Sequence, residues 1–235
     1  VNQTLMRSDV TVKHSHKVQR LPRGRRKLEA VEWIHQDRIG YLFPRPASIH
    51  VSNQAEQGRW SDITDQKNIS QKLVTEDVFM LWFDHGARPS HASYQYMVVP
   101  NVSVQTLKAT ADNNRHLEIL SNTADVQAVK HEKLGLSQMV FYTPGRINIS
   151  DGMDIQAHSP GVIMLKTRGP KIQTLTVSDP SRKQSRMRIT VPGIYTARSE
   201  HFVAQADRYE NKSVILVHLP QGVYAGKSVV VSLSF

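Results

Sequence analysis

The side chains that could perform chemistry gather in one short stretch of the sequence. His85, His91, Tyr94 and Tyr96 follow one another closely, and arginines lie nearby. A histidine or tyrosine can remove the proton α to a carboxylate, and an arginine can stabilise the resulting anion. Tyrosines two positions apart are also ordinary strand formers that share one sheet face. We therefore expect no complete active site and no catalytic residue in this chain.

A second candidate site is the basic segment between residues 13 and 27. No acidic residue occurs between Asp9 and Glu29, so this segment dominates the net charge of +10. It could follow a polyanion through charge-assisted bonds to sulfate or carboxylate, or it could be a solvated loop that serves solubility. The substrate-binding candidates of the whole chain are Arg23, Arg25, Arg26, Lys27, Trp60, His85 and Arg88.

The two tryptophans of the N-terminal part have two interpretations. Trp33 and Trp60 could stack on sugar rings, because an aromatic face suits the C–H face of a pyranose. In an all-β domain a tryptophan is more often part of the core. Both interpretations stay open at this point.

Several classes of function are excluded or disfavoured. The chain has no cysteine, no phosphate-binding glycine loop and no nucleophile elbow. His14 and His16 have the spacing of metal ligands but no third ligand nearby, so we expect no metal and no cofactor. No apolar run is long enough to span a membrane. The positive charge suits nucleic acid, an acidic membrane surface or an acidic polysaccharide, but no nucleic-acid recognition motif is present.

The segments around these residues have the patterns of strands. Residues 78–83 form an apolar run of strand length, and residues 92–99 alternate between two faces. Residues 84–91 between them carry Gly86 and Pro89. We therefore predict an antiparallel hairpin with a polar loop.

The remaining chain predicts an all-β fold of antiparallel sandwiches. We expect strands at residues 1–5, 102–107 and 126–131, among others, and a last strand at 228–235. Short strands separated by Gly and Pro follow residue 134, as in β-sandwiches. In residues 185–190 basic side chains alternate with apolar ones, which predicts a basic outer face and an apolar inner face. No helix is predicted. We place a domain boundary between residues 134 and 135.

Five ordered blocks, together with a further segment, carry a resemblance to a known family. The blocks lie at residues 33–44, 58–63, 79–89, 94–100 and 120–129, and the further segment at residues 177–181. In this order they resemble polysaccharide lyase family 8, which includes the chondroitin AC, hyaluronan and xanthan lyases. The chondroitin AC type looks most similar. The segment Ser61-Asp62-Ile63-Thr64 departs from the asparagine-bearing version expected in that block.

The resemblance implies that this chain is the non-catalytic part of a longer enzyme. Residues 1–134 would be the later part of the central super-sandwich domain, and residues 135–235 the C-terminal β-sandwich domain. In such lyases a preceding helical domain supplies the catalytic residues, and none of its motifs occurs here. Since the chain begins at Val1 without an initiator methionine, we expect a processed or excised piece of a longer polypeptide.

The implied parent is a secreted or periplasmic bacterial lyase that cleaves an acidic glycosaminoglycan by β-elimination. Its partners would be that polysaccharide and the helical domain of the same polypeptide. A second hypothesis from another class is a stand-alone carbohydrate-binding or adhesive module. The sequence leaves open the exact glycosaminoglycan and whether cleavage is endo or exo.

Overall fold

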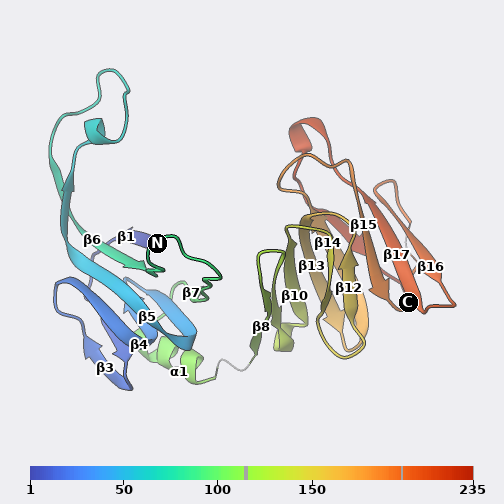
Figure 1. Cartoon of the computed structure of the whole chain (residues 1–235), viewed down its shortest axis with the longest axis horizontal. Helices are drawn as coiled ribbons and strands as arrows, with labels where there is room; N and C mark the ends of the chain where they lie inside the picture. Colours follow the sequence, from blue (N-terminus) through green and yellow to red (C-terminus); the bar gives the residue numbers. More distant parts are fainter. Residues whose placement is uncertain (114–115, 197, 235) are drawn as a thin grey trace. The chain divides into compact units, whose positions relative to one another are not determined.

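The computed structural model describes residues 1–113, 116–196 and 198–234, and its regular structure is mostly antiparallel sheet (Figure 1). The all-β prediction is therefore confirmed. The chain divides at residues 114 and 115 into two compact units. The predicted boundary after residue 134 falls inside the second unit, between two strands of one sheet. Phe235, the end of the last predicted strand, lies outside the described residues.

The first unit is built on one seven-stranded sheet. Its order is β1-β6-β5-β4-β2-β3, and β7 pairs with β5 beside this path. The elements are β1 (Asn2–Leu5), β2 (Thr11–His14), β3 (Lys17–Arg20), β4 (Gly24–Gln36), β5 (Ile39–Gly58), a 3-10 turn (Trp60–Asp62), β6 (Val74–Trp82), β7 (Met97–Val99) and the helix α1 (Val104–Asp112). The basic segment is therefore largely strand and not a loop.

The long hairpin of β4 and β5 organises this sheet. Its turn holds Asp37 and Arg38 at φ values of 45° and 64°, the left-handed pair that a two-residue hairpin turn needs. Both strands extend far beyond this turn. The register slips near Val31, opposite the stretch of β5 that contains Pro44 and Pro46. Prolines cannot donate to a ladder, so a local irregularity accommodates them.

The predicted pairing of residues 78–83 with residues 92–99 is wrong. β6 pairs with β5 and β1, whereas β7 pairs with the other end of β5, at Gly40 to Leu42. Residues 83–96 form no strand. The twenty-residue β5 is long enough to offer one edge to both partners, which sequence alternation alone does not reveal.

The strand predicted at residues 102–107 is also wrong, because the chain forms α1 there. Ser103 caps the helix, and its Oγ accepts a hydrogen bond from Thr106 N at 3.1 Å. Leu107 is fully buried and belongs to a small cluster with Trp33 and Leu42. A Cβ added to Gly40 would lie 2.4 Å from Leu107 Cδ1, so this glycine permits the close approach of the helix. Trp33 is thus a core residue.

The second unit is a sandwich of two sheets. One sheet has the order β18-β14-β13-β10-β9-β8 and the other β11-β12-β15-β17-β16. The strands are β8 (Leu117–Asn122), β9 (Val126–His131), β10 (Leu136–Phe141), β11 (Gly145–Asn148), β12 (Asp154–Ala157), β13 (Gly161–Arg168), β14 (Lys171–Ser178), β15 (Arg186–Pro192), β16 (Phe202–Asp207), β17 (Lys212–His218) and β18 (Val229–Ser232), with 3-10 turns at Glu132–Leu134 and Gly222–Tyr224.

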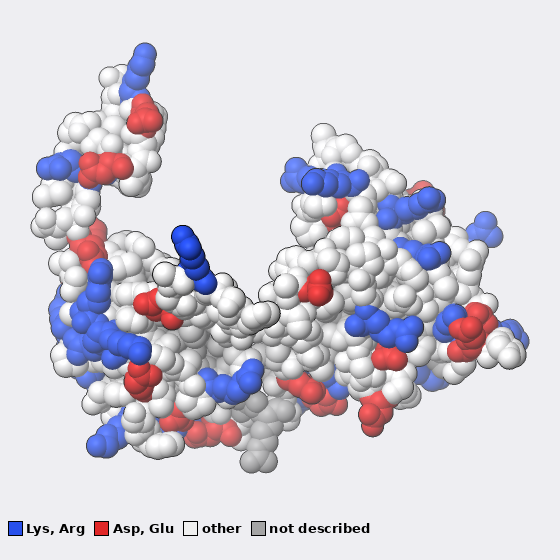
Figure 2. Space-filling view, viewed as in Figure 1, with Lys and Arg blue, Asp and Glu red and all other residues white. Residues whose placement is uncertain are grey.

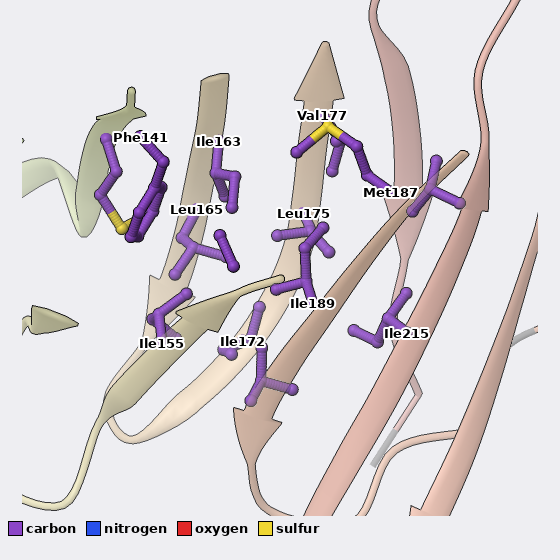
Figure 3. Packing of buried hydrophobic residues seen from close by; sticks show 14 of the residues in the cluster. Phe141, Ile155, Ile163, Leu165, Ile172, Leu175, Val177, Met187, Ile189 and Ile215 are labelled. Atoms are coloured by element: carbon purple, nitrogen blue, oxygen red, sulfur yellow. The ribbon is translucent and has the colours of Figure 1, made fainter. Parts of the chain in front are cut away.

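The core of the second unit lies between its two sheets. Figure 3 shows Ile163 and Leu175 of one sheet packed toward Ile155, Ile189 and Ile215 of the other. Burial of such aliphatic side chains is the main stabilising contribution to a sandwich of this kind. The alternation predicted along residues 185–190 is confirmed, since the apolar residues of β15 are buried and its arginines are exposed.

Candidate functional site

The strands β4, β5 and β6 form a surface that carries two of the seven predicted binding residues, Arg25 and Lys27. Successive side chains of a strand point to opposite faces. In β4, exposed Arg25 and Lys27 alternate with half-buried Arg26. The register places Lys27 opposite His50 of β5, and His50 opposite Trp82 of β6. Arg25, Lys27, His50 and Trp82 are named here the cationic–aromatic face.

Close ring contacts hold this face together. The guanidinium carbon of Arg25 lies 5.7 Å from the centroid of the Trp82 ring. The His50 ring stacks on Trp82 with a centroid distance of 5.2 Å and an interplanar angle of 21°. An aromatic ring can receive the C–H face of a pyranose, and a guanidinium can pair with a carboxylate or sulfate. The arrangement is chemically suited to an acidic sugar.

The cations around this face are paired with carboxylates. Lys27 Nζ lies 2.7 Å from Glu29 Oε1 and Arg25 Nη2 lies 3.8 Å from Glu56 Oε1. Figure 2 shows Lys and Arg gathered at the left of the view, with Asp and Glu beside them. The hydrogen bond from Lys27, and a second from Ser48, hold the pKa of Glu29 below its ordinary value. The positive charge of this face is therefore partly offset within the protein.

Arg23 and Arg26 have structural partners of their own. Arg23 forms a two-pronged ion pair with Asp77 of β6, whose Oδ2 lies 2.6 Å from Arg23 Nη2. The hydrogen bond from Arg23 lowers the pKa of Asp77. Arg26 Nη2 donates to the carbonyl oxygens of Pro22 at 2.6 Å and Arg23 at 2.8 Å. Arg26 thus fixes the turn that leads into β4.

His85 belongs to a separate group of rings that packs, through Phe83 and Tyr96, against the hydrophobic core of the first unit. Its ring lies parallel to Phe83 at 6.3 Å and 6.1 Å from Tyr94, measured between centroids. Tyr96 continues the group toward buried Phe43, at 6.3 Å. A general base needs hydrogen-bond reach to the proton it removes, about 2.6–3.2 Å. The contacts of His85 with Phe83 and Tyr94 are those of aromatic packing.

The structure does not bring the remaining two candidates to the cationic–aromatic face. Trp60 is 55% exposed, in the 3-10 turn beyond the end of β5, whereas Arg25 pairs with Ser52 well inside that strand. Arg88 is exposed in the loop after β6, at a positive φ of 52°. The seven predicted residues therefore occupy several separate places on the first unit.

No metal centre is found in the described part of the chain, where no three metal-binding side chains come together. His14 Nε2 lies 2.8 Å from Gln19 Nε2, and His16 Nδ1 lies 3.6 Å from Glu32 Oε1. The two histidines therefore have different neighbours, and their spacing in the sequence does not create a shared site.

Sequence reasoning missed His50 and Trp82. Trp82 stands in an apolar run, but its side chain is only partly buried. Burial within β6 separates Phe79 and Leu81, which are buried, from half-buried Met80 and Trp82. The sequence does not show this difference, because residues 78–83 are all apolar. His50 could be identified only with the register of β4, β5 and β6.

Comparison with known proteins gives consistent results for both units. Residues 1–111 match polysaccharide lyase family 8, super-sandwich domain, and residues 118–188 match polysaccharide lyase family 8, C-terminal beta-sandwich domain. The chain is 30% identical over 203 residues to chondroitinase-AC of Pedobacter heparinus, covering 86% of this chain and 26% of that protein. It is 35% identical over 123 residues to the xanthan lyase of Bacillus sp. strain GL1, covering 49% of this chain and 13% of that protein.

Solved structures agree with these matches. A chondroitinase AC lyase studied as enzyme–oligosaccharide complexes superposes with a TM-score of 0.76 and 28% identity, covering 97% of this chain and 31% of that one. The chain thus spans about a quarter of the length of the chondroitinase-AC that it matches. Among the described residues, no helix has the length and hydropathy that a membrane crossing requires. Both units and their order along the sequence show that the chain belongs to polysaccharide lyase family 8.

Proposed function

We propose that this chain is the non-catalytic β part of a lyase that cleaves a uronate-containing polysaccharide by β-elimination. The observation that carries the proposal is the succession of the two family 8 β domains, at residues 1–111 and 118–188. The names of the relatives, chondroitinase-AC and hyaluronate lyase, favour chondroitin or hyaluronan as the substrate. The chain would support a helical catalytic domain of the same polypeptide.

The division of labour in this proposal follows from the residues present. Proton removal needs an acid and a base within hydrogen-bond reach of one substrate atom. The rings of His85 and Tyr94 pack against each other, with their centroids 6.1 Å apart. The proton chemistry is therefore assigned to the helical domain, and this chain is assigned a supporting and binding role.

The proposed contribution to substrate binding is made by the cationic–aromatic face. Trp82 would receive a sugar ring, while Arg25 and Lys27 would pair with its carboxylate or sulfate groups. Arg23, Trp60, His85 and Arg88 would extend the contact along a long polymer, whereas Arg26 would act through the turn that it fixes. Because such a polymer is encountered outside the cytoplasm, we place the enzyme in the periplasm or medium of a bacterium.

The test compares the native polypeptide with this 235-residue chain. An antibody against the chain captures the native protein, whose mass is measured and which is assayed on chondroitin and hyaluronan by the ultraviolet absorbance of unsaturated uronate products. We expect a longer native polypeptide with lyase activity, and a 235-residue chain that binds chondroitin without cleaving it. Cleavage by the isolated chain would overturn the proposal.

The binding role has a separate test. In affinity electrophoresis through gels containing chondroitin sulfate, the variant R25Q/K27Q should be retarded less than the unsubstituted chain. A matched control, K67Q/K72Q, removes the same charge from the exposed segment after Trp60. Equal loss of retardation in both variants would contradict a binding role for the face, and tight binding by a native polypeptide without lyase activity would favour a stand-alone module.

A further inference from the structure

The outer face of the five-stranded sheet in the second unit contains a groove that is lined entirely by residues of that unit. It encloses about 660 Å³ and is lined by side chains of β15, β16 and β17 and by His158, which follows β12. This volume lies within the range of about 300–1,000 Å³ that is typical of small-molecule sites.

Strand alternation explains why the groove is basic. Met187 and Ile189 of β15 point into the core of the second unit and are buried. Arg186 and Arg188 therefore point to the opposite face, where both are exposed. The sheet register sets Arg188 opposite Leu216 of β17. The two arginines thus stand one pleat apart along one side of the groove.

The groove has no acidic counterpart to these arginines. None of its lining residues is Asp or Glu. Within residues 1–113, 116–196 and 198–234, neither Arg186 nor Arg188 forms an ion pair with a carboxylate. Both guanidinium groups therefore have donors available for an external anion, and a guanidinium matches the geometry of a carboxylate or sulfate.

His158 orients one of these arginines. Its Nδ1 lies 3.2 Å from Arg188 Nη2, and its Nε2 lies 2.9 Å from Thr190 Oγ1. Since a guanidinium can only donate, Nδ1 must accept and the ring proton belongs on Nε2. This arrangement holds Arg188 toward the groove without neutralising its charge.

The floor of the groove is apolar and partly exposed. Leu216 lies opposite Val203, and Val214 continues the same row of β17. All three side chains are of intermediate burial. An apolar floor beside two guanidinium groups matches a sugar ring that presents C–H groups on one face and an anionic substituent at its edge.

We propose that this groove is a second binding site for an acidic oligosaccharide, held by Arg186 and Arg188 through its sulfate or carboxylate groups. The site rests on the proposed function only for the choice of ligand class. Its charge, shape and lining belong to the C-terminal sandwich alone. It would give the polysaccharide a contact that is independent of the cationic–aromatic face.

The experiment titrates the ¹⁵N-labelled 235-residue chain with a chondroitin 4-sulfate hexasaccharide and follows amide shifts and affinity. We expect shifts in β15, β16 and β17, and no shifts with neutral maltohexaose. In a chain that already carries R25Q/K27Q, the added changes R186Q/R188Q should weaken binding about tenfold, since charge-assisted bonds are lost from both arginines. A hyaluronan hexasaccharide separates carboxylate binding from sulfate binding.

The matched control is K133Q/R168Q in the same background. Both residues are exposed in the second unit and do not line the groove, and the change removes the same charge. Binding should stay within about twofold of the background. Thermal unfolding of each variant checks that the sandwich remains folded.

The outcomes separate this inference from the proposed function. Equal weakening by R186Q/R188Q and by the control, or shifts confined to the first unit, would overturn the groove while leaving the proposed function standing. Absence of any binding would also overturn it. If the native polypeptide lacks lyase activity but the hexasaccharide still shifts the groove, the proposed function fails and the site remains.

Discussion

The two basic strands β4 and β15 differ in how their charges are neutralised. Around β4, Arg23, Arg25 and Lys27 each have a carboxylate partner, on β6, β5 and β4 respectively. Along β15, Arg186 and Arg188 have no carboxylate partner among the described residues. Charge density in the sequence is much higher around β4. The positive charge that can attract an external anion also depends on whether the cations are already paired with carboxylates. By this measure the arginines of β15 are more available than the cations of β4.

This difference has a consequence for binding. An exposed ion pair contributes little to stability, but its carboxylate competes with an incoming sulfate for the same donors. A polysaccharide must displace Glu29 or Glu56, or share the cation with it, to bind fully at β4. At β15 a neutral histidine positions Arg188, so no acidic competitor has to be displaced.

The largest loss of stability should follow from removing a carboxylate that accepts hydrogen bonds from backbone N–H groups and is not paired with a cation. Asp179 is 4% exposed, and its carboxylate accepts hydrogen bonds from the backbone N–H groups of Ser181, Lys183 and Gln184. D179A leaves these donors without their acceptor. We expect a loss of about 2–4 kcal/mol in the free energy of unfolding of the second unit, measured by urea denaturation.

The control is D77A in the first unit, which removes the exposed partner of Arg23 and should shift the urea midpoint far less. Acid provides a second readout. Burial acts to raise the pKa of Asp179, but the hydrogen bonds from Ser181, Gln184 and Lys183 outweigh it and lower the pKa. This stabilisation is present above the ordinary aspartate pKa and is lost as the pH falls through the lower folded value. The D179A variant should not show this loss of stability in acid. An equal loss in D179A and in the unsubstituted chain would contradict the stabilising role given to the Asp179 carboxylate.

An intermediate effect should follow from removing the acidic competitors around β4. The variant E29Q/E56Q frees Lys27 and Arg25 from their partners while preserving side-chain size. Affinity for chondroitin sulfate should rise about three- to fivefold at low salt, and the gain should shrink at high salt because exposed charges are screened. The measurement is the salt concentration needed for elution from immobilised chondroitin sulfate.

The control for net charge is D65N/D112N, which makes the same change at exposed positions of the first unit, one after β5 and one at the end of α1. The salt concentration needed for elution should change much less for D65N/D112N than for E29Q/E56Q. If both variants elute at the same salt concentration, overall charge and not the release of paired cations controls binding, and the contrast between β4 and β15 loses its meaning.

Local patterns in the sequence predicted strands well, because side-chain alternation is a local property. Residues 126–131 were predicted as a strand with the bounds that β9 has. The basic outer face of β15 was also predicted, since burial alternates there without interruption. The short strand β12 was missed, and α1 was taken for a strand because residues 102–107 alternate briefly, while the Ser103 cap was overlooked.

Pairing between distant segments could not be predicted in the same way. Arg23 and Asp77 are 54 residues apart in the sequence and meet in space because β6 folds back along the sheet. The sequence therefore identified the basic segment but not the carboxylates that neutralise it. The same limitation hid the row of Lys27, His50 and Trp82, which exists only in the register of three strands.

The smallest predicted effect is on the pH dependence of stability and concerns His158. This residue contacts Arg188 of β15, whereas carboxylates contact the cations of β4. Burial, and then the nearby charge of Arg188, lower the pKa of His158 below its ordinary value. A histidine that is held neutral makes the folded state bind fewer protons than the unfolded state. Stability should therefore fall slightly as the pH drops from the ordinary histidine pKa toward the lower folded value.

The variant H158Q removes this titration but keeps an amide oxygen that can accept from Arg188, so its stability should not fall in that pH window. Guanidinium unfolding across the window measures the difference, and the imidazole shifts of His158 report its titration directly. H50Q is the matched comparison, because His50 lies 3.8 Å from the carboxylate of Asp84. An unchanged pH response in H158Q would mean that the neutral ring does not hold Arg188, and that β15 needs another explanation for its exposed, unpaired arginines.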